Sequence, residues 1–461
     1  MSNNIINDNI TISNNSILKK NEFESKENEF EEKNEYKEEN KYKEENEYKE
    51  ENESEYTSET EENASLSDDD VINQSDNLNL EGSILNKYNI LTELGRGTYS
   101  IVWLAYCIED KKYYAIKVQH PNEYKEGLEE NNFVKSLPNI NVFNTIICDF
   151  KETRNNQIFL CTVYNLHGSD LDCILRKSKY NNGIPFNIAK KMFIQILEAC
   201  NYLHTKLKVY HADIKTDNIL LKGISKKNSK IIELYNKFNF NDLYLEAKKE
   251  HGINKKILPS KKLKIRTKIH TEIFNKISLM ITDINLEKYD IADKYILNSD
   301  VCLADFGQFV ENGEYYDESF GTRYYRSPEN ILVGKSSYPN DIWALGCTFY
   351  EILTGRILFD PDKDKKYSRD DYHLKLINEA CGDFTIGFLK STKLHKKYFL
   401  NDKIKMNINL DYNNKIENKL KNILTNDNEY NIAIKLIKGM LQINPSNRLT
   451  CFNALKILNY E

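Results

Sequence analysis

The feature that most constrains this chain is a series of short motifs that follow one another in a fixed order. The first is the glycine-rich turn GRGTYS, which spans residues 95–100 between two predicted strands. Glycines lack a Cβ, so such a turn can bring backbone N–H groups over phosphate oxygens. A strand follows the turn rather than a helix, which excludes the dinucleotide-binding fingerprint. By itself the turn is weak evidence, because glycine pairs in hairpins are usually simple turns.

Four further motifs follow the glycine-rich turn. Lys117 lies in the strand pattern AIK, where a Lys is rarely tolerated without an acidic partner, and Glu130 in the next helical stretch can supply that partner. The loop HADIKTDN spans 211–218, the triplet DFG spans 305–307, and SPE spans 327–329. Each motif alone is explained as core or turn. Their common order, each in its expected structural context, is not explained in that way.

The hydrophobic patterns around these motifs predict an α+β fold in two lobes. Alternating apolar and polar residues with glycine-rich turns indicate a small β-rich lobe at 88–166. Apolar residues at helical spacing then indicate a larger helical lobe at 167–458. A Lys- and Asn-rich insert at 224–299, with 16 basic and 9 acidic residues, interrupts this second lobe.

Residues 1–82 differ in composition from the rest of the chain. They contain 25 acidic residues against 8 lysines, whereas the whole chain has a net charge of −6. A hexapeptide that begins YKEEN recurs from Tyr36, and its period matches neither a helix nor a strand, so no apolar face forms. We expect this tail to be disordered. It is either an acidic interaction arm or a solvating tail, and its composition favours the solvating tail.

Composition also excludes several classes of protein. No apolar run approaches the roughly 20 residues that span a bilayer, and Met1–Asn15 lacks the basic and apolar regions of a signal peptide. The nine cysteines are scattered without a C-x-x-C pair, which suits a reducing compartment. We therefore expect a soluble, monomeric intracellular protein of the cytoplasm or nucleus, without a membrane partner. The insert carries no nucleic-acid-reading motif, so no nucleic-acid partner is expected either.

Taken together, the motifs resemble those of protein kinases over 88–458, apart from the insert. The segments GTYSIVWLA, HADIKTDNILL and GTRYYRSPE are most similar to the SR-protein kinases of the CMGC group. The resemblance implies a bilobal protein kinase fold and a Ser/Thr protein kinase that uses ATP and Mg²⁺ to modify protein substrates. The alternative is a catalytically weak kinase-fold scaffold or binding protein. The presence of Lys117, Asp213 and Asp305 disfavours that alternative.

The resemblance implies catalytic and metal-binding roles for five residues. Asp213 would accept the proton of the attacking hydroxyl, and Lys215 would neutralise charge on the transferring phosphoryl group. Thr322 would brace these two residues. Asp305 and Asn218 would bind Mg²⁺.

It also implies a nucleotide site. Lys117, oriented by Glu130, would hold the α- and β-phosphates. In the segment that joins the lobes, Leu166 would offer its backbone N–H to adenine, and Val163 would be the gatekeeper behind the nucleotide. The glycine-rich turn and its flanks would cover the phosphates with Leu94, Gly95, Arg96, Gly97, Thr98, Tyr99, Ser100, Ile101 and Val102.

Three further expectations concern support and switching. Glu329 would form a buried ion pair with Arg448, and Asp341 would hold the backbone of the catalytic loop. Ala212 stands where most protein kinases have an Arg that receives a phosphate from the activation segment. We therefore expect activity that does not require phosphorylation of that segment.

The sequence departs from the SR-protein kinases in the groove that docks Arg/Ser-rich substrates. That groove is lined by acidic residues, but two of the expected carboxylates are replaced by Arg356 and Tyr372, and only Glu379 persists. We therefore expect this chain to share the family's kinase activity but not its substrate preference, because its acidic docking groove is depleted.

Overall fold

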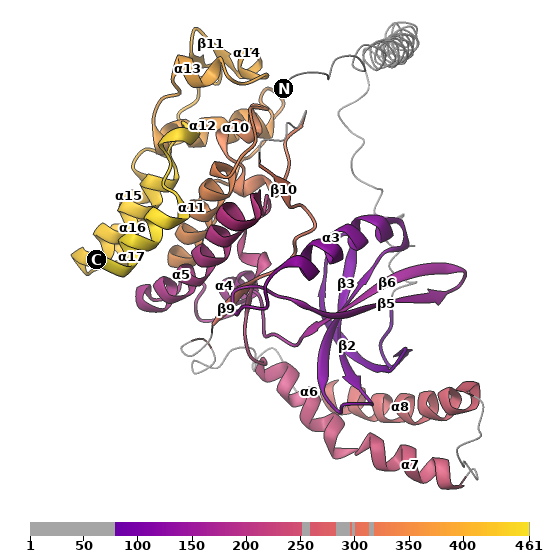
Figure 1. Ribbon diagram of the computed structural model, residues 1–461. Coiled ribbons are helices and arrows are strands. Elements are labelled where there is room, and N and C mark those ends of the chain that lie inside the picture. The colour runs from indigo at the N-terminus through magenta and orange to yellow at the C-terminus, as the bar shows by residue number, and fades with distance from the viewer. Residues whose placement is uncertain (1–78, 251–258, 283–295, 297–299, 313–317, 461) are drawn as a thin grey trace, which may run out of the picture. The chain divides into compact units, whose positions relative to one another are not determined.

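The computed structural model describes residues 79–250, 259–282, 296, 300–312 and 318–460 (Figure 1). The described chain begins with a β-rich lobe, whose six strands form one antiparallel sheet in the order β1-β2-β3-β4-β6-β5. The strands are β1 (Ile84–Leu85), β2 (Tyr88–Arg96), β3 (Ser100–Cys107), β4 (Tyr113–Gln119), β5 (Ile146–Arg154) and β6 (Gln157–Asn165).

The pairing register of this sheet decides which side chains share a face. Val102 of β3 pairs with Lys117 of β4, and Lys117 pairs with Thr162 of β6, so these three side chains lie on one face. Successive residues in a strand alternate between faces. The opposite face therefore carries the core of the lobe, in which the following residues are fully buried: Trp103, Ile116 and Val163.

Helix α3 (Tyr124–Ser136) packs against β5 and β6, after the 3-10 turn η2 (Pro121–Glu123) (Figure 1). The helix buries Glu130, whose exposed fraction is only 4%. A carboxylate at such a position needs a cation or hydrogen-bond donors to offset its lost hydration. Lys117 on β4 supplies the cation, which ties α3 to the sheet.

Two long helices form the centre of the helical lobe, α5 (Phe186–Tyr202) and α11 (Pro339–Thr354). Between them the rings of Phe193 and Phe349 stack with their centroids 4.1 Å apart. Helix α11 ends at Gly355, which has a φ of +66°. A Cβ at Gly355 would lie 2.3 Å from the carbonyl oxygen of Asn181, so glycine is required on both counts.

Shorter helices and strand pairs complete the helical lobe. The remaining helices are α4 (Leu171–Lys177), α10 (Pro328–Ile331), α12 (Arg369–Cys381), α13 (Ile386–Leu389), α14 (His395–Tyr398), α15 (Lys415–Ile423), α16 (Asp427–Met440) and α17 (Cys451–Tyr460). The strands pair as β7 (Val209–Tyr210) with β10 (Val310–Glu311), β8 (Ile219–Leu221) with β9 (Val301–Leu303), and β11 (Phe399–Leu400) with β12 (Lys403–Ile404). Short turns are the π-helical η3 (Leu203–Leu207) and the 3-10 turns η4 (Thr216–Asn218), η6 (Arg323–Tyr325) and η7 (Pro445–Asn447).

The insert forms three helices, α6 (Lys226–Lys237), α7 (Phe240–Glu250) and α8 (Pro259–Thr282). In sequence it interrupts the helical lobe, but in space its helices pack against the sheet of the β-rich lobe (Figure 1). Leu91, Leu104 and Tyr106 of the sheet form one hydrophobic cluster with apolar residues of the insert. We call this cluster the insert core; its buried insert residues are Ile231, Leu234, Tyr235, Phe240, Ile269, Ile273 and Ile277.

The β-rich lobe begins before Tyr88, where the sequence placed its start. The predicted disordered tail, 1–82, lies outside the described residues except for its last four, and Leu80 among these is 2% exposed within the core of the lobe. Gly82 is also buried, against the ring of Phe274. Among the residues that the structure describes, no helix is both long enough and apolar enough to cross a membrane.

The burial of Leu80 yields a stability prediction. Leu80→Ala removes apolar atoms from a packed core, so we expect it to lower the free energy of unfolding by about 2–4 kcal/mol. Leu128→Ala is the matched control, because Leu128 is 38% exposed and its truncation should cost less than about 1 kcal/mol. Urea unfolding of both variants measures the difference. Equal urea midpoints for the two variants would show that residues before Tyr88 are not part of the core.

Candidate active site

A cleft of about 410 Å³ is lined by residues from both lobes and by the first turn of the insert. This cleft is lined by most of the residues that were predicted to bind the nucleotide or Mg²⁺. They are Leu94, Gly95, Gly97, Ser100, Val102, Lys117, Glu130, Asn218 and Asp305. These residues come from β2, β3, β4, α3, the catalytic loop and the segment after β9.

Other members of the predicted nucleotide set do not line this cleft. Ile101 is fully buried in the core on the opposite face of the sheet, because it alternates with Val102. Arg96 pairs with Glu93 at the surface, and Thr98 and Tyr99 at the tip of the turn are exposed. The direction of these side chains does not decide whether the backbone N–H groups at the tip of the turn can contact phosphates.

Lys117 lies between two carboxylates. Its Nζ is 2.8 Å from Oε2 of Glu130 and 3.2 Å from Oδ1 of Asp305. Burial by itself disfavours the charged amine, but Glu130 and Asp305 outweigh this effect and raise the pKa of Lys117 above its usual value. Lys117 in turn holds the pKa of Asp305 below its usual range. Lys117 and Asp305 are therefore both charged at the cleft. The side chain of Asp305 is 53% exposed there.

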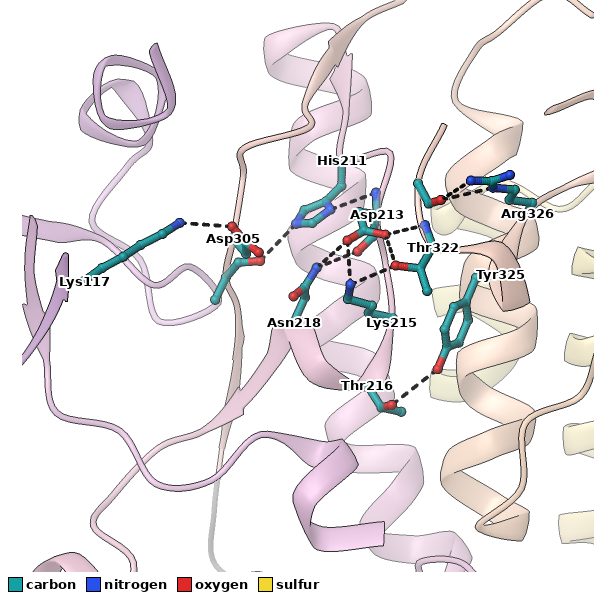
Figure 2. A network of polar contacts seen from close by, with 12 residues as sticks. Lys117, His211, Asp213, Lys215, Thr216, Asn218, Asp305, Thr322, Tyr325 and Arg326 are labelled. Carbon is teal, nitrogen blue, oxygen red and sulfur yellow. Dashed lines mark hydrogen bonds and ion pairs between the residues drawn. The ribbon is translucent and has the colours of Figure 1, made fainter. Parts of the chain in front are cut away.

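Asp213 is the centre of a second polar network (Figure 2). Its Oδ1 accepts hydrogen bonds from the backbone N of Thr322 at 2.8 Å and from Oγ1 of Thr322 at 2.7 Å. Its Oδ2 is 2.9 Å from Nζ of Lys215, and the same Nζ donates to Oγ1 of Thr322 at 2.8 Å. The three residues therefore form a closed set of contacts, in which Thr322 links Asp213 to Lys215.

The environment of Asp213 keeps its carboxylate ionised. Burial alone would favour the neutral acid, but the charge of Lys215 and the hydrogen bonds from Lys215 and Thr322 are stronger together. The pKa of Asp213 consequently lies below its usual range. Asp213 is thus a hydrogen-bond acceptor at neutral pH.

Asn218 joins this network to the cleft. Its Nδ2 donates to the backbone oxygen of Asp213 at 2.8 Å and to Oδ2 of Asp213 at 3.2 Å. Both bonds are donated by the amide nitrogen, which leaves the amide oxygen as a possible metal ligand. Asn218 and Asp305 line the same cleft, so the two predicted metal ligands can offer an amide oxygen and a carboxylate there.

Asp341 of α11 holds the backbone of the catalytic loop (residues 211–218), as predicted from the sequence. Asp341 is 1% exposed and accepts the backbone N–H groups of His211 at 2.8 Å and Ala212 at 3.0 Å. His204 lies 2.9 Å from the same carboxylate through Nε2. Ala212 has a φ of +67°, an uncommon conformation for a residue with a Cβ, and the bond to Asp341 helps to hold it.

The expected buried pair below the activation segment is present. Nη1 and Nη2 of Arg448 lie 2.6 Å and 2.7 Å from the two carboxylate oxygens of Glu329. A second buried acid, Glu351 of α11, accepts from the hydroxyl of Tyr325 at 2.5 Å and pairs with Arg176 of α4. Sequence reasoning missed this second network. Glu351 lies ten residues after Asp341 in an apolar helix, and a lone acid in that pattern is its one sequence signal.

The structure describes the two ends of the activation segment, which runs from Asp305 to Glu329. Tyr315 and Tyr316 in its middle lie outside the described residues. At the C-terminal end Arg323 pairs with Asp370 of α12. Arg326 donates to Oγ of Ser319 at 2.9 Å. Arg323 is therefore already paired with a carboxylate, so it is not an unpaired cation that could receive a phosphate.

The predicted gatekeeper is wrong by one residue. Val163 faces the core on the far side of the sheet, whereas Tyr164 pairs with Ala115 of β4 and lines the cleft together with it. The reason is strand alternation, because a shift of one residue moves every side chain to the other face. Leu166 likewise packs against the insert core, and the cleft is lined instead by Asn165 and His167.

These positions can be separated by two substitutions. Tyr164→Ala should enlarge the cleft and change nucleotide affinity, because Tyr164 lines it beside Lys117. Val163→Ala should instead leave nucleotide affinity unchanged and cost about 1–3 kcal/mol of stability through a core cavity. Titration calorimetry with ADP and thermal unfolding measure the two effects. A change of affinity in Val163→Ala alone would restore the original assignment.

Comparisons with known proteins give a consistent result. The family described as "Protein kinase domain" matches residues 88–235 and 286–458. Serine/threonine-protein kinase SRPK of Physarum polycephalum is 28% identical over 330 residues, which cover 68% of this chain and 71% of that protein. Dual specificity protein kinase CLK1 of Mus musculus is 26% identical over 389 residues, 81% of this chain and 66% of that protein. A crystal structure of a kinase domain matches with a TM-score of 0.56 at 20% identity, over 82% of this chain and 97% of that chain.

The family match covers most of the chain and leaves out residues 236–285, which lie inside the insert. The solved structure shows the shared fold, and the relatives are kinases of the SR-protein and CLK types. The bilobal kinase fold and the CMGC resemblance predicted from the sequence are thereby confirmed. This chain belongs to the protein kinase family.

Proposed function

We propose that this protein is a Ser/Thr protein kinase that transfers the γ-phosphoryl group of ATP to hydroxyl groups of proteins. One observation carries the proposal. Lys117 and Asp305 at the cleft, and Asp213, Lys215 and Thr322 beside it, form two charged networks, and Asn218, which bonds to Asp213, lines the cleft together with Asp305. Phosphoryl transfer needs positioning and charge stabilisation more than covalent chemistry, and these networks supply both.

On this proposal Lys117 binds the anionic phosphates of ATP, and Glu130 keeps the amine in place. The ion pair with Glu130 is short and buried, so the amine enters the cleft with a fixed position. A fixed charge costs little reorganisation when phosphate charge is redistributed. The backbone N–H of Leu166 remains a proposed contact of adenine, and its neighbours Asn165 and His167, which line the cleft, are added as further proposed backbone contacts.

The residues present fit Mg²⁺. A hard cation prefers oxygen ligands and usually combines one or two protein groups with substrate phosphates. The carboxylate of Asp305 is half exposed, and the amide oxygen of Asn218 is left over after its nitrogen binds Asp213. Asp305 and Asn218 would hold the ion, which would neutralise phosphate charge when bound.

Asp213 orients the attacking hydroxyl and accepts its proton. The carboxylate is ionised and held by Thr322 and Lys215, so one acceptor is aimed at a fixed place. Lys215 contributes positive charge near the phosphoryl group in transfer. Lys215 two residues after Asp213 is typical of Ser/Thr kinases, which is why Ser/Thr is preferred to Tyr.

We further propose weak or single-site recognition of basic substrates. Glu379, the one groove acid that persists, is 5% exposed at its side chain and accepts backbone N–H groups of Leu410 and Tyr412 at 3.0 Å and 2.9 Å. Its carboxylate is thereby already used inside the protein. Arg356 is exposed, and the hydroxyl of Tyr372 donates to Asp364. An Arg-rich peptide needs several carboxylates in one groove, because a single exposed pair contributes only about 0.2–1 kcal/mol.

The kinase assignment predicts two inactive variants. Lys117→Met and Asp213→Ala should each lower phosphoryl transfer by at least about 10²-fold, because they remove phosphate binding and hydroxyl orientation respectively. Lys112→Met is the matched control, since Lys112 is exposed on the turn before β4 and should remain fully active. Radiolabelled ATP and a Ser/Thr peptide library measure the rates, and circular dichroism checks the fold. Full activity of Asp213→Ala would contradict the assignment, whereas a wild type without any transfer would point to the scaffold alternative.

The groove argument predicts how an Arg/Ser-repeat substrate is modified. Singly phosphorylated product should accumulate before multiply phosphorylated product, because the substrate dissociates after each transfer. Intact-mass analysis of a time course distinguishes the two. Arg356→Asp with Tyr372→Asp should shift the products towards multiple phosphorylation. Multiply phosphorylated product in the wild type, with unmodified substrate still present, would overturn the proposed preference.

A further inference from the structure

The insert occupies an unusual place in the path of the chain. Strands β8 and β9 are direct antiparallel neighbours, with Leu221 paired to Val301, so a short turn could join them. The chain instead leaves the helical lobe after β8, packs α6, α7 and α8 on the other lobe, and returns to β9. The insert is therefore joined covalently to the helical lobe at both ends and packs noncovalently against the β-rich lobe, so it bridges the two lobes in addition to the segment after β6.

Buried polar contacts fix the insert on the β-rich lobe. The hydroxyl of Tyr235 accepts from Nδ2 of Asn89 at 2.8 Å, and Nε of Arg266 donates to the oxygen of the same amide at 2.8 Å. His270 contacts Tyr235 through Nδ1 and the backbone oxygen of Ile90 through Nε2, at 3.2 Å and 2.9 Å. These directional contacts, made by Asn89, Tyr235, Arg266 and His270 inside the protein, favour one position for the helices. Burial lowers the pKa of His270 to about 4, so the ring is neutral at pH 7.

The face of β3 that the insert covers is the face that forms the cleft. Val102 lines the cleft, and Leu104 and Tyr106, two and four residues further on, belong to the insert core. These three positions share one face because strand side chains alternate. Leu94 does both, since it lines the cleft and packs against the insert core. The insert thus adjoins the cleft directly, without an intervening layer.

The first turn of α6 completes one wall of this cleft. Ser225 caps the helix by accepting the backbone N–H of Asn228 at 3.2 Å, and Ser225, Lys227 and Asn228 all line the cleft. Lys227 is half-buried, whereas its neighbour Lys226 is exposed and does not line the cleft. A cation that is partly withdrawn from water at a cleft is placed to attract an anionic ligand.

We infer that the insert is part of the nucleotide site and that Lys227 contacts the bound nucleotide. This inference rests on the proposed function, because it assumes that an adenine nucleotide occupies the cleft. Lys227 adds positive charge to a cleft that also contains the acids Asp170 and Asp217. The anchored helices hold α6 in place, so nucleotide affinity depends on a segment that lies outside the kinase motifs.

Binding of Mg·ADP to the full chain tests the inference without a phosphoryl transfer step. Lys227→Met keeps most of the apolar stem and removes the charge, and we expect it to weaken ADP binding about three- to tenfold. Lys227→Arg should keep the affinity within about twofold. Lys226→Met is the control on the same turn and should bind like the wild type. Equilibrium dialysis with radiolabelled ADP gives the dissociation constants.

Thermal unfolding separates a nucleotide contact from a structural role. Without nucleotide, Lys227→Met should melt at the wild-type temperature, and the rise of melting temperature at a fixed ADP concentration should be smaller than in the wild type. Equal ADP affinity in Lys227→Met and Lys226→Met would overturn the inference. The inference would also be overturned if Lys227→Met melted below the wild-type temperature without ADP by enough to account for its lost ADP affinity. A wild type that binds no ADP would instead contradict the proposed function itself.

Discussion

The buried carboxylate of Asp341 is the interaction on which the active-site geometry depends. It accepts two successive backbone N–H groups, those of His211 and Ala212, and it contacts His204. These donors replace the water that a carboxylate loses on burial, so the charge is tolerated inside the lobe. Because Asp341 belongs to α11, which is buried from Asn340 to Thr354, the catalytic loop takes its position from a helix inside the lobe. Asp213, which follows Ala212 directly, inherits that position.

The second constraint is that one face of the sheet both lines the cleft and packs against the insert. On this face of β3, Val102 lines the cleft, whereas Leu104 and Tyr106 belong to the insert core. The far face of the same strand carries Trp103 and Ala105 in the core of the lobe. Both faces of β3 are consequently covered, which explains why the strand SIVWLAYC is almost continuously apolar and not alternating.

Sequence reasoning located the motifs but not every side chain around them. Lys117, Asp213 and Asp305 could be found because charged residues in apolar surroundings, at these spacings, have few structural explanations. The gatekeeper could not be fixed in the same way. β6 is buried on both faces from Phe159 to Tyr164, with Thr162 as the one polar residue there, so its sequence does not alternate in a way that distinguishes Val163 from Tyr164. Only pairing with β4 decides the register.

The insert shows a different limit. It is rich in lysines and asparagines, yet Ile231, Leu234 and Tyr235 recur at helical spacing and form a narrow apolar stripe. A stripe predicts that something covers the helix, but it does not say which lobe does so. Leu80 was missed for a related reason, since one apolar residue in a polar tail gives no periodic signal.

The central claim is that the two charged networks transfer the γ-phosphoryl group of ATP to protein hydroxyls. The most direct measurement compares ATP labelled at the γ-phosphate with ATP labelled at the α-phosphate, using a mixed protein substrate and Mg²⁺, followed by phosphoamino-acid analysis. Our account predicts label from the γ-position only, on phosphoserine and phosphothreonine, with no transfer when Mg²⁺ is chelated. Nucleotide binding without any transfer of label, or transfer from the α-position, would contradict it.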